Sequence, residues 1–225
     1  MNEGPRRLED LGVVFDMDGV LLDSTACHSQ AFGEVLIPLG ILNFSYARFA
    51  GWRTPEVFRT VFLEAGLCMT EAEIADYSHR KSARSRQLLE ENSQIFTCNT
   101  PVVSKLSALY PLALASSGSR GSVENFLEKS GLRDAFRVVM SGDDVSRAKP
   151  DPEIFLRAVA GLNLPSSRCV VVEDAESGIQ AARAAGAIAC SFGKDFGGAL
   201  QRAGASCRIE SLSELPALLE SLRTS

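Results

Sequence analysis

The sequence has no C-x-x-C pair, no basic stripe and no long apolar run, and each absence excludes a class of protein. Its six cysteines are scattered along 225 residues, so we expect no zinc or disulfide framework and interpret several as small buried hydrophobes in a reducing compartment. A formal net charge of −5 gives no electrostatic footprint for nucleic acid. No apolar run approaches the ~20 residues that span a bilayer, and the charged segment from Met1 to Asp10 is not expected to be a signal peptide. We therefore expect a cytoplasmic protein with no nucleic-acid or membrane partner.

What is present is an alternation of strands and helices in most of the chain. Short apolar runs that predict strands occupy Leu11 to Phe15, Pro111 to Ala115, Arg137 to Met140, Cys169 to Val172 and a segment around Ile188 to Ser191. Amphipathic helices are predicted between the later strands, and a terminal helix from about residue 213. Repeated strand–helix units of this length predict an α/β protein with a parallel sheet covered on both faces.

The segment between residues 24 and 91 breaks this alternation, because it has no strand pattern. We predict helices from Thr25 to Leu39, from Thr54 to Gly66 and from Thr70 to Leu89, with Ser24 and Thr54 as N-caps of the first two. A helical insertion after the first strand predicts two domains. These are an α/β core of residues 1–23 and 94–225 and a small all-helical domain of residues 24–93.

Polar residues stand at or just beyond the ends of four predicted strands. They are Asp16 and Asp18, Ser116 and Ser117, Lys149, and Glu173 and Asp174. Carboxyl ends of parallel strands share one edge of a sheet, where α/β proteins place their ligands. An aspartate can attack phosphorus, and neighbouring carboxylates attract Mg²⁺. Taken alone, each acidic pair also fits a helix cap.

In this order and spacing the four groups resemble the motifs of the haloacid dehalogenase superfamily of phosphotransferases, in the helical-cap branch of β-phosphoglucomutase and phosphoglycolate phosphatase. Asp16-Met17-Asp18-Gly19 matches the first motif, Ser116 the second, Lys149-Pro150 the third and Glu173-Asp174 the fourth. The resemblance covers Leu11 to Leu222. It implies a Rossmann-like three-layer core with an inserted helical cap, and a Mg²⁺-dependent phosphatase acting on a sugar phosphate or phosphoglycolate.

The chemistry of phosphoryl transfer gives these residues distinct roles. Asp16 would attack phosphorus and form an aspartyl-phosphate, and Asp18 would protonate the leaving oxygen and then activate water. For that role we expect the pKa of Asp18 to lie above that of a free carboxyl. Ser116 would hold phosphoryl oxygens, and Lys149 would neutralise charge on the nucleophile and on the transferring group.

The metal site follows from the resemblance. It implies Asp174, the Asp16 side chain and the Asp18 backbone carbonyl as direct ligands of Mg²⁺. Glu173 either ligates the metal or supports the ligands from behind, and the sequence leaves this open.

Candidate substrate-binding residues come from the predicted cap and from the second motif. His28 resembles a histidine of sugar-phosphate members, with a surface histidine as the alternative. Arg53 lies in a Gly-Trp-Arg turn that can present a guanidinium to an anion or hold a core tryptophan. Ser117 can bind substrate or cap a helix. We expect a cationic exposed face on the third cap helix, made of Arg80, Lys81, Arg84 and Arg86, with Lys81 pointing into the cleft as the alternative.

Two other functions are considered. A β-phosphoglucomutase-like phosphomutase would use the same residues. A receiver-type signalling module carries no helical insertion, and a non-catalytic protein is expected to have lost one of the four groups, none of which is missing here. Dehalogenase and phosphonoacetaldehyde hydrolase activities are disfavoured, because Asp18 and the Glu173-Asp174 pair point to metal-assisted phosphoryl chemistry. As cofactor we expect Mg²⁺, as partner a small phosphorylated metabolite, and in solution a monomer or weak dimer.

Overall fold

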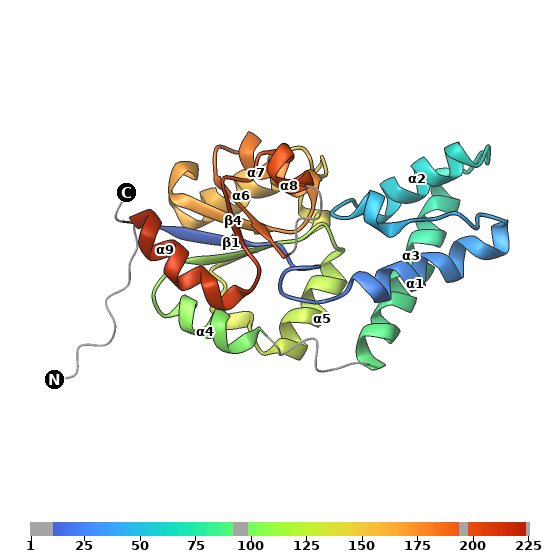
Figure 1. The fold of residues 1–225 in the computed structure, drawn as a ribbon. Helices are drawn as coiled ribbons and strands as arrows, with labels where there is room; N and C mark the ends of the chain where they lie inside the picture. Colours follow the sequence, from blue (N-terminus) through green and yellow to red (C-terminus); the bar gives the residue numbers. More distant parts are fainter. Residues whose placement is uncertain (1–10, 92–98, 194–197, 224–225) are drawn as a thin grey trace.

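The computed structural model describes residues 11–91, 99–193 and 198–223, and its centre is a six-stranded parallel sheet (Figure 1). The strand order is β3-β2-β1-β4-β5-β6, and every neighbouring pair is parallel. The strands are β1 (Gly12–Phe15), β2 (Leu112–Ala115), β3 (Val138–Met140), β4 (Cys169–Glu173), β5 (Ile188–Phe192) and β6 (Cys207–Ile209). Five of them lie where the sequence predicts strands. The sixth was missed, because its three residues contain no apolar run.

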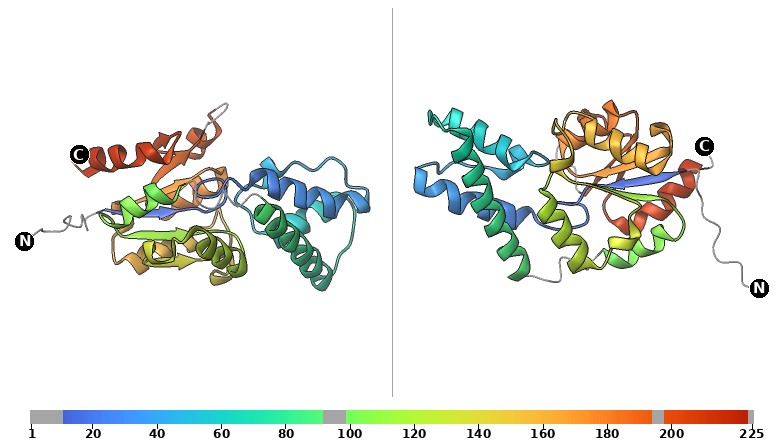
Figure 2. Two further views of the ribbon diagram at one scale, coloured as in Figure 1. Left: turned by 90° about the horizontal axis from the view of Figure 1, so that it is seen from below. Right: turned by 180° about the vertical axis from the view of Figure 1, so that it is seen from behind.

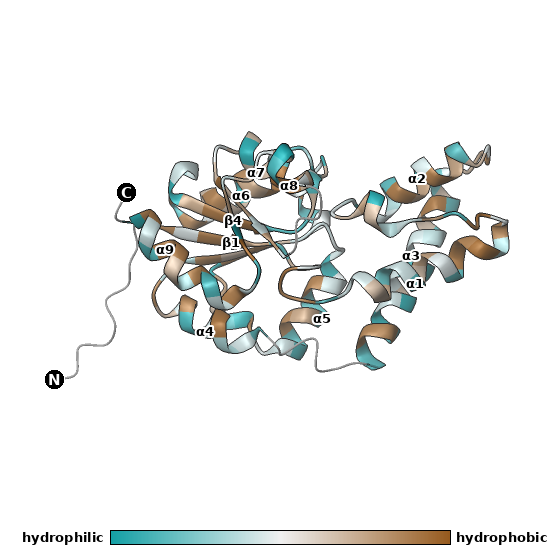
Figure 3. Ribbon diagram, viewed as in Figure 1, coloured by the Kyte–Doolittle hydropathy of each residue, from teal (hydrophilic) through white to brown (hydrophobic). Residues whose placement is uncertain are grey.

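Helices cover both faces of the sheet, which confirms the predicted three-layer core (Figure 2). One face carries α4 (Thr100–Ser107), α5 (Arg120–Ser130) and α9 (Leu215–Arg223), and the other carries α6 (Glu153–Leu162), α7 (Glu176–Ala184) and the short α8 (Ala199–Ala203). Alternate strand residues supply the two cores: Val13 and Phe15 pack with the first layer and Val14 with the second. Figure 3 shows the resulting concentration of apolar residues on the strands.

The second structural unit is a helical segment beyond the carboxyl ends of the strands (Figure 1). It consists of α1 (Thr25–Leu36), a 3-10 turn at Ile37–Leu39, α2 (Thr54–Glu64) and α3 (Glu71–Glu91). These helices bury an apolar cluster of their own, rich in aromatic residues such as Phe32, Phe58 and Phe62. The helical segment therefore has a core that is separate from the two sheet cores.

Two details of this segment differ from the predictions. The N-cap of α2 is Arg53, and Thr54 is already its first helical residue. Ser24 is the N-cap residue of α1, as predicted, but its side chain makes no capping hydrogen bond and donates to Asp18 instead. The predicted domain division stays a prediction, and its boundary at residues 93 and 94 lies outside the described residues.

The cysteines match their interpretation only in part. Cys169 and Cys190 are buried and Cys27 and Cys207 half-buried, but Cys68 is exposed, and the sixth cysteine lies outside the described residues. Within residues 11–91, 99–193 and 198–223, no helix has the length and apolarity needed to cross a membrane.

Candidate active site

The site is organised around the carboxyl ends of β1 and β4. The chain leaves β1 toward β2 on one side and later returns to β4 on the other, so these two strand ends form a topological switch point. Asp16 follows β1 and donates its backbone N–H to Val172 O at 3.0 Å, which aligns it with Glu173 at the end of β4. Carboxylate oxygens of Asp16, Glu173 and Asp174 lie within 4.8 Å of one another.

Lys149 is buried between two of these carboxylates. Its Nζ lies 2.6 Å from Asp16 Oδ1 and 2.6 Å from Glu173 Oε1, and it donates to Ala115 O at 3.4 Å. Burial lowers the pKa of Lys149, but the charges of Asp16 and Glu173 outweigh it and raise that pKa. The lysine is therefore a fixed positive charge that ties β1, β2 and β4 together at their ends.

The carboxylates exceed what one lysine can neutralise. Burial raises the pKa of Asp16 to about 7, with Glu173 and Asp18 adding to burial and Lys149 opposing it. Burial, Glu173 and Asp16 raise the pKa of Asp174 well above its usual range, and no hydrogen-bond partner of its side chain lies among the described residues. The site thus has a surplus of buried negative charge, which a cation would offset.

Glu173 is fully engaged by protein groups. Its Oε1 accepts from Lys149 and its Oε2 accepts from the Ala175 N–H at 2.9 Å. Gly178 on α7 leaves room for this carboxylate, because a Cβ there would stand 1.9 Å from Oε1. These contacts favour a supporting role for Glu173 and leave Asp16 and Asp174 as the carboxylates with free oxygens.

The turn after β1 depends on Gly19. Its φ of +85° is in the left-handed region, and a Cβ would lie 1.9 Å from Asp174 Oδ2. Glycine is needed for both reasons. The turn therefore brings the fourth motif against the first.

Asp18 contacts a different set of residues, which belong to the helical segment. Its Oδ1 accepts from Ser24 Oγ at 2.6 Å and from His28 Nε2 at 2.9 Å. Lys81 Nζ, from α3, lies 2.7 Å from His28 Nδ1. Because an ammonium group only donates, Nδ1 is the acceptor and Nε2 carries the proton that Asp18 receives as a hydrogen bond.

This network overturns the expected pKa of Asp18. Burial raises the pKa of Asp18, but the hydrogen bonds from His28 and Ser24 and the charge of Lys81 lower it below its usual value, so the carboxyl is ionised in this arrangement. The expected exposure of Lys81 is also wrong, because its side chain is buried and lies 4.4 Å over the Phe32 ring. Burial lowers the pKa of Lys81 to about 8.

The serines after β2 have two different surroundings. Ser116 is buried, and its Oγ accepts from the Gly118 N–H at 3.0 Å, which leaves its own proton available to a ligand. Ser117 Oγ donates to Gly51 O at 2.7 Å, and Ser177 Oγ donates to Ala50 O at 3.2 Å. These two core serines hold a loop of the helical segment. Nothing in the sequence indicated Ser177, because its partner lies 127 residues away.

His28 and Arg53 line two adjoining cavities between the helical segment and the core. His28 lines a cavity of about 40 Å³ beside Asp18, and Arg53 lines one of about 180 Å³ that also borders Ser117. Trp52 is 37% exposed, which excludes the core tryptophan considered above. It lines a third cavity of about 620 Å³, next to Asp174.

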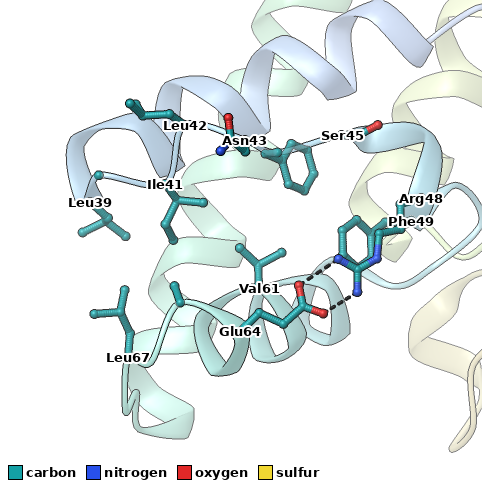
Figure 4. Close-up of a pocket in the computed structure, with 13 residues that line it drawn as sticks. Leu39, Ile41, Leu42, Asn43, Ser45, Arg48, Phe49, Val61, Glu64 and Leu67 are labelled. Atoms are coloured by element: carbon teal, nitrogen blue, oxygen red, sulfur yellow. Dashed lines mark hydrogen bonds and ion pairs between the residues drawn. The ribbon is translucent and has the colours of Figure 1, made fainter.

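A fourth cavity, of about 480 Å³, lies inside the helical segment (Figure 4). Apolar side chains such as Ile41, Val61 and Leu67 line it, together with the ion pair of Arg48 and Glu64. It contains none of the predicted site residues.

A parallel sheet with carboxylates and a lysine at its switch point, facing a helical segment, defines an α/β phosphotransferase-type hydrolase. The chain belongs to the haloacid dehalogenase-like hydrolase family, whose model matches residues 13–191. It is 31% identical over 175 residues to the fructose-1-phosphate phosphatase YqaB of Escherichia coli. The alignment covers 78% of this chain and 92% of the phosphatase. It is 30% identical over 220 residues to a phosphoglycolate phosphatase of Cupriavidus necator, with 94% of each chain covered. The fold is similar to that of a β-phosphoglucomutase from Clostridium difficile, with a TM-score of 0.81 at 21% identity, covering 97% of this chain and 100% of that one.

Proposed function

We propose that the protein is a Mg²⁺-dependent phosphatase that hydrolyses a small phosphorylated metabolite, a sugar phosphate or a phosphoglycolate-type acid. The observation that carries the proposal is the buried Lys149 shared between Asp16 and Glu173, beside Asp174, whose side chain has no partner in the described part of the chain. The phosphatases among the relatives support the same class of reaction.

Asp16 would be the nucleophile. Lys149 holds its Oδ1 in place, and a carboxylate oxygen of Asp16 attacks phosphorus as the ester P–O bond breaks. The aspartyl-phosphate forms on Asp16, and the ester oxygen leaves with a proton. Ser116 donates its hydroxyl proton to a phosphoryl oxygen, and the Lys149 charge stabilises the developing negative charge nearby.

Asp18 would act as the general acid and then as the general base. In the arrangement described, Asp18 is ionised and can accept a proton from the water that hydrolyses the aspartyl-phosphate. To protonate the leaving oxygen first, it must carry a proton, which its hydrogen bond with His28 and the charge of Lys81 oppose. These two residues lie on α1 and α3, so a displacement of the helical segment would remove the groups that hold the pKa of Asp18 low.

The donor set fits Mg²⁺, which binds few carboxylates and keeps several waters. Asp16, Asp174 and the backbone carbonyl of Asp18 would hold the ion, with Glu173 supporting Lys149. When bound, the ion supplies positive charge against the carboxylate surplus and the phosphoryl oxygens.

The test is phosphate release from a panel of phosphorylated metabolites, with Mg²⁺ and with a chelator. We expect Mg²⁺-dependent release, which Asp16→Asn lowers by at least about 10³-fold without a change in thermal stability. Asp23→Asn, the same chemical change at an exposed position, is the control. A fully active Asp16→Asn enzyme would exclude the nucleophile assignment, and conversion of β-glucose 1-phosphate to glucose 6-phosphate without phosphate release would show a mutase.

A further inference from the structure

Arg86, on α3, lies at the junction of the two cavities between the helical segment and the core. It lines both the cavity beside Asp18 and the larger cavity bordered by Arg53. Thr54, Ser82 and Ser119 also line both, so the two spaces adjoin along this seam. A molecule placed beside Asp18 would therefore extend past Arg86 into the larger cavity.

Arg86 differs from its neighbours in having no partner. On the same helical segment, Arg84 pairs with Glu34 at 2.6 Å and Arg59 with Glu71 at 2.6 Å. Arg86 has neither a hydrogen bond nor an ion pair with any residue in the described part of the chain, although its side chain is only partly exposed. Its charge is thus available to a ligand in the cavity.

The larger cavity is positive. It is lined by Arg53, Arg86 and His79, and among the described residues around it the one acid is the exposed Asp143. The carboxylate of Asp143 accepts from the Arg120 N–H at 2.8 Å. Arg53 itself has only a 3.9 Å contact with Glu56.

The size of this space also suits an anionic group. Its volume of about 180 Å³ exceeds that of a carboxylate or phosphate with a few waters, since a water occupies about 30 Å³ in the liquid. Guanidinium groups bind carboxylate and phosphate through paired charge-assisted hydrogen bonds.

We propose that Arg86 is a specificity-determining residue, which together with Arg53 selects substrates that carry a second anionic group beyond the reacting phosphoryl. This inference rests on the proposed function. The shared chemistry is a carboxylate or a second phosphate, held at the cap side of the cleft while the first phosphate reaches Asp16.

The experiment compares matched substrates that differ in the second anion. Phosphoglycolate is paired with ethylene glycol monophosphate, which has an alcohol in place of the carboxylate, and fructose 1,6-bisphosphate is paired with fructose 1-phosphate. In the pair that shows the preference, we expect the wild type to have a KM at least about tenfold lower for the member with the second anionic group, since one such contact is worth a factor of this order. The pair that shows the preference distinguishes carboxylate from phosphate.

The variants locate the effect. Arg86→Met keeps the length of the side chain without its charge, and it is expected to raise KM for the substrate with two anionic groups about tenfold more than for its partner with the phosphate alone. Arg86→Lys should restore part of the preference. Arg80→Met removes an exposed charge from the same helix, outside both cavities, and should change neither KM.

The outcomes separate this inference from the proposed function. An enzyme that releases phosphate but shows no preference within either pair, or loses it equally in Arg80→Met, would overturn the role of Arg86. A wild type that releases no phosphate from any substrate, including p-nitrophenyl phosphate, would overturn the proposed function itself.

Discussion

Replacing Lys149 with methionine removes the one cation that, among the described residues, contacts the buried carboxylates of Asp16 and Glu173. Lys149 is fully buried, Glu173 is fully buried, and the Asp16 side chain is 6% exposed. Methionine has a similar length, so the substitution removes charge without opening a large cavity. Asp16 and Glu173 are then left facing each other with no counter-charge.

The cost follows from that geometry. Removing one partner of a buried ion pair typically lowers the free energy of unfolding by about 3–5 kcal/mol. For a chain of this size, about 2–4 °C are lost per kcal/mol, so the midpoint of thermal unfolding should fall by roughly 6–20 °C. The double variant Lys149→Met/Glu173→Gln should recover about half of the loss, because one of the two stranded charges is gone while the amide oxygen still accepts the Ala175 N–H.

The assay is thermal unfolding at pH 7 with a chelator present, so that no cation replaces the lysine. Arg147→Met is the control, since this arginine lies in the same loop with its side chain 71% exposed and should change stability by less than about 0.5 kcal/mol. The reasoning would be refuted by a Lys149→Met protein within about 1 kcal/mol of the wild type, or by a double variant whose loss equals the sum of the two single losses.

Two further predictions concern the helical segment. Burial lowers the pKa of Lys81 from 10.5 to about 8. The unfolded chain therefore binds more protons between these values, and wild-type stability should gain up to about 3 kcal/mol from this group as pH rises through that window. Lys81→Met lacks this gain, so urea unfolding at pH 7.5 and at pH 10 should show its stability relative to the wild type falling, and a constant difference would contradict the buried charge. The double variant Ser117→Ala/Ser177→Ala removes the two hydrogen bonds to the loop at Ala50 and Gly51, at about 1 kcal/mol each. The equilibrium between the loop held on the core and the loop released from it should therefore shift toward release by up to about 30-fold. The fluorescence of Trp52, the single tryptophan, should then be quenched more strongly by acrylamide. Unchanged quenching would contradict the idea that the Ser117 and Ser177 hydrogen bonds hold the loop.

Much of the core was predictable because its signals are local. A short apolar run that ends at acids, as in Phe15-Asp16, marks a strand and its carboxyl end without any knowledge of the partner strands. Parallel strands then bring Asp16 and Glu173 to one edge, since their ends must align. β6 was not predicted, because a three-residue edge strand with one buried apolar residue has almost no hydrophobic periodicity in the sequence.

The environment of Asp18 was not predictable in the same way. The sequence placed it beside other carboxylates and so suggested a raised pKa, but the side chain points to His28 and Ser24. Lys81, 53 residues from His28 in the chain, belongs to a helix whose composition resembles a solvated surface. Its burial depends on how α1 and α3 pack together and onto the core.

By itself, the sequence determined the strand–helix order, the motifs at the strand ends and the family to which the chain belongs, because each depends on residues close together in the chain. Only the tertiary structure decided that Asp18 is ionised and that Ser117 and Ser177 hold the loop before Trp52. It also decided that Arg86 lines two cavities with no partner among residues 11–91, 99–193 and 198–223. The physical reason is that burial and charge pairing are set by contacts between distant elements. Such contacts change the pKa and the availability of a side chain without leaving any mark on the residues beside it.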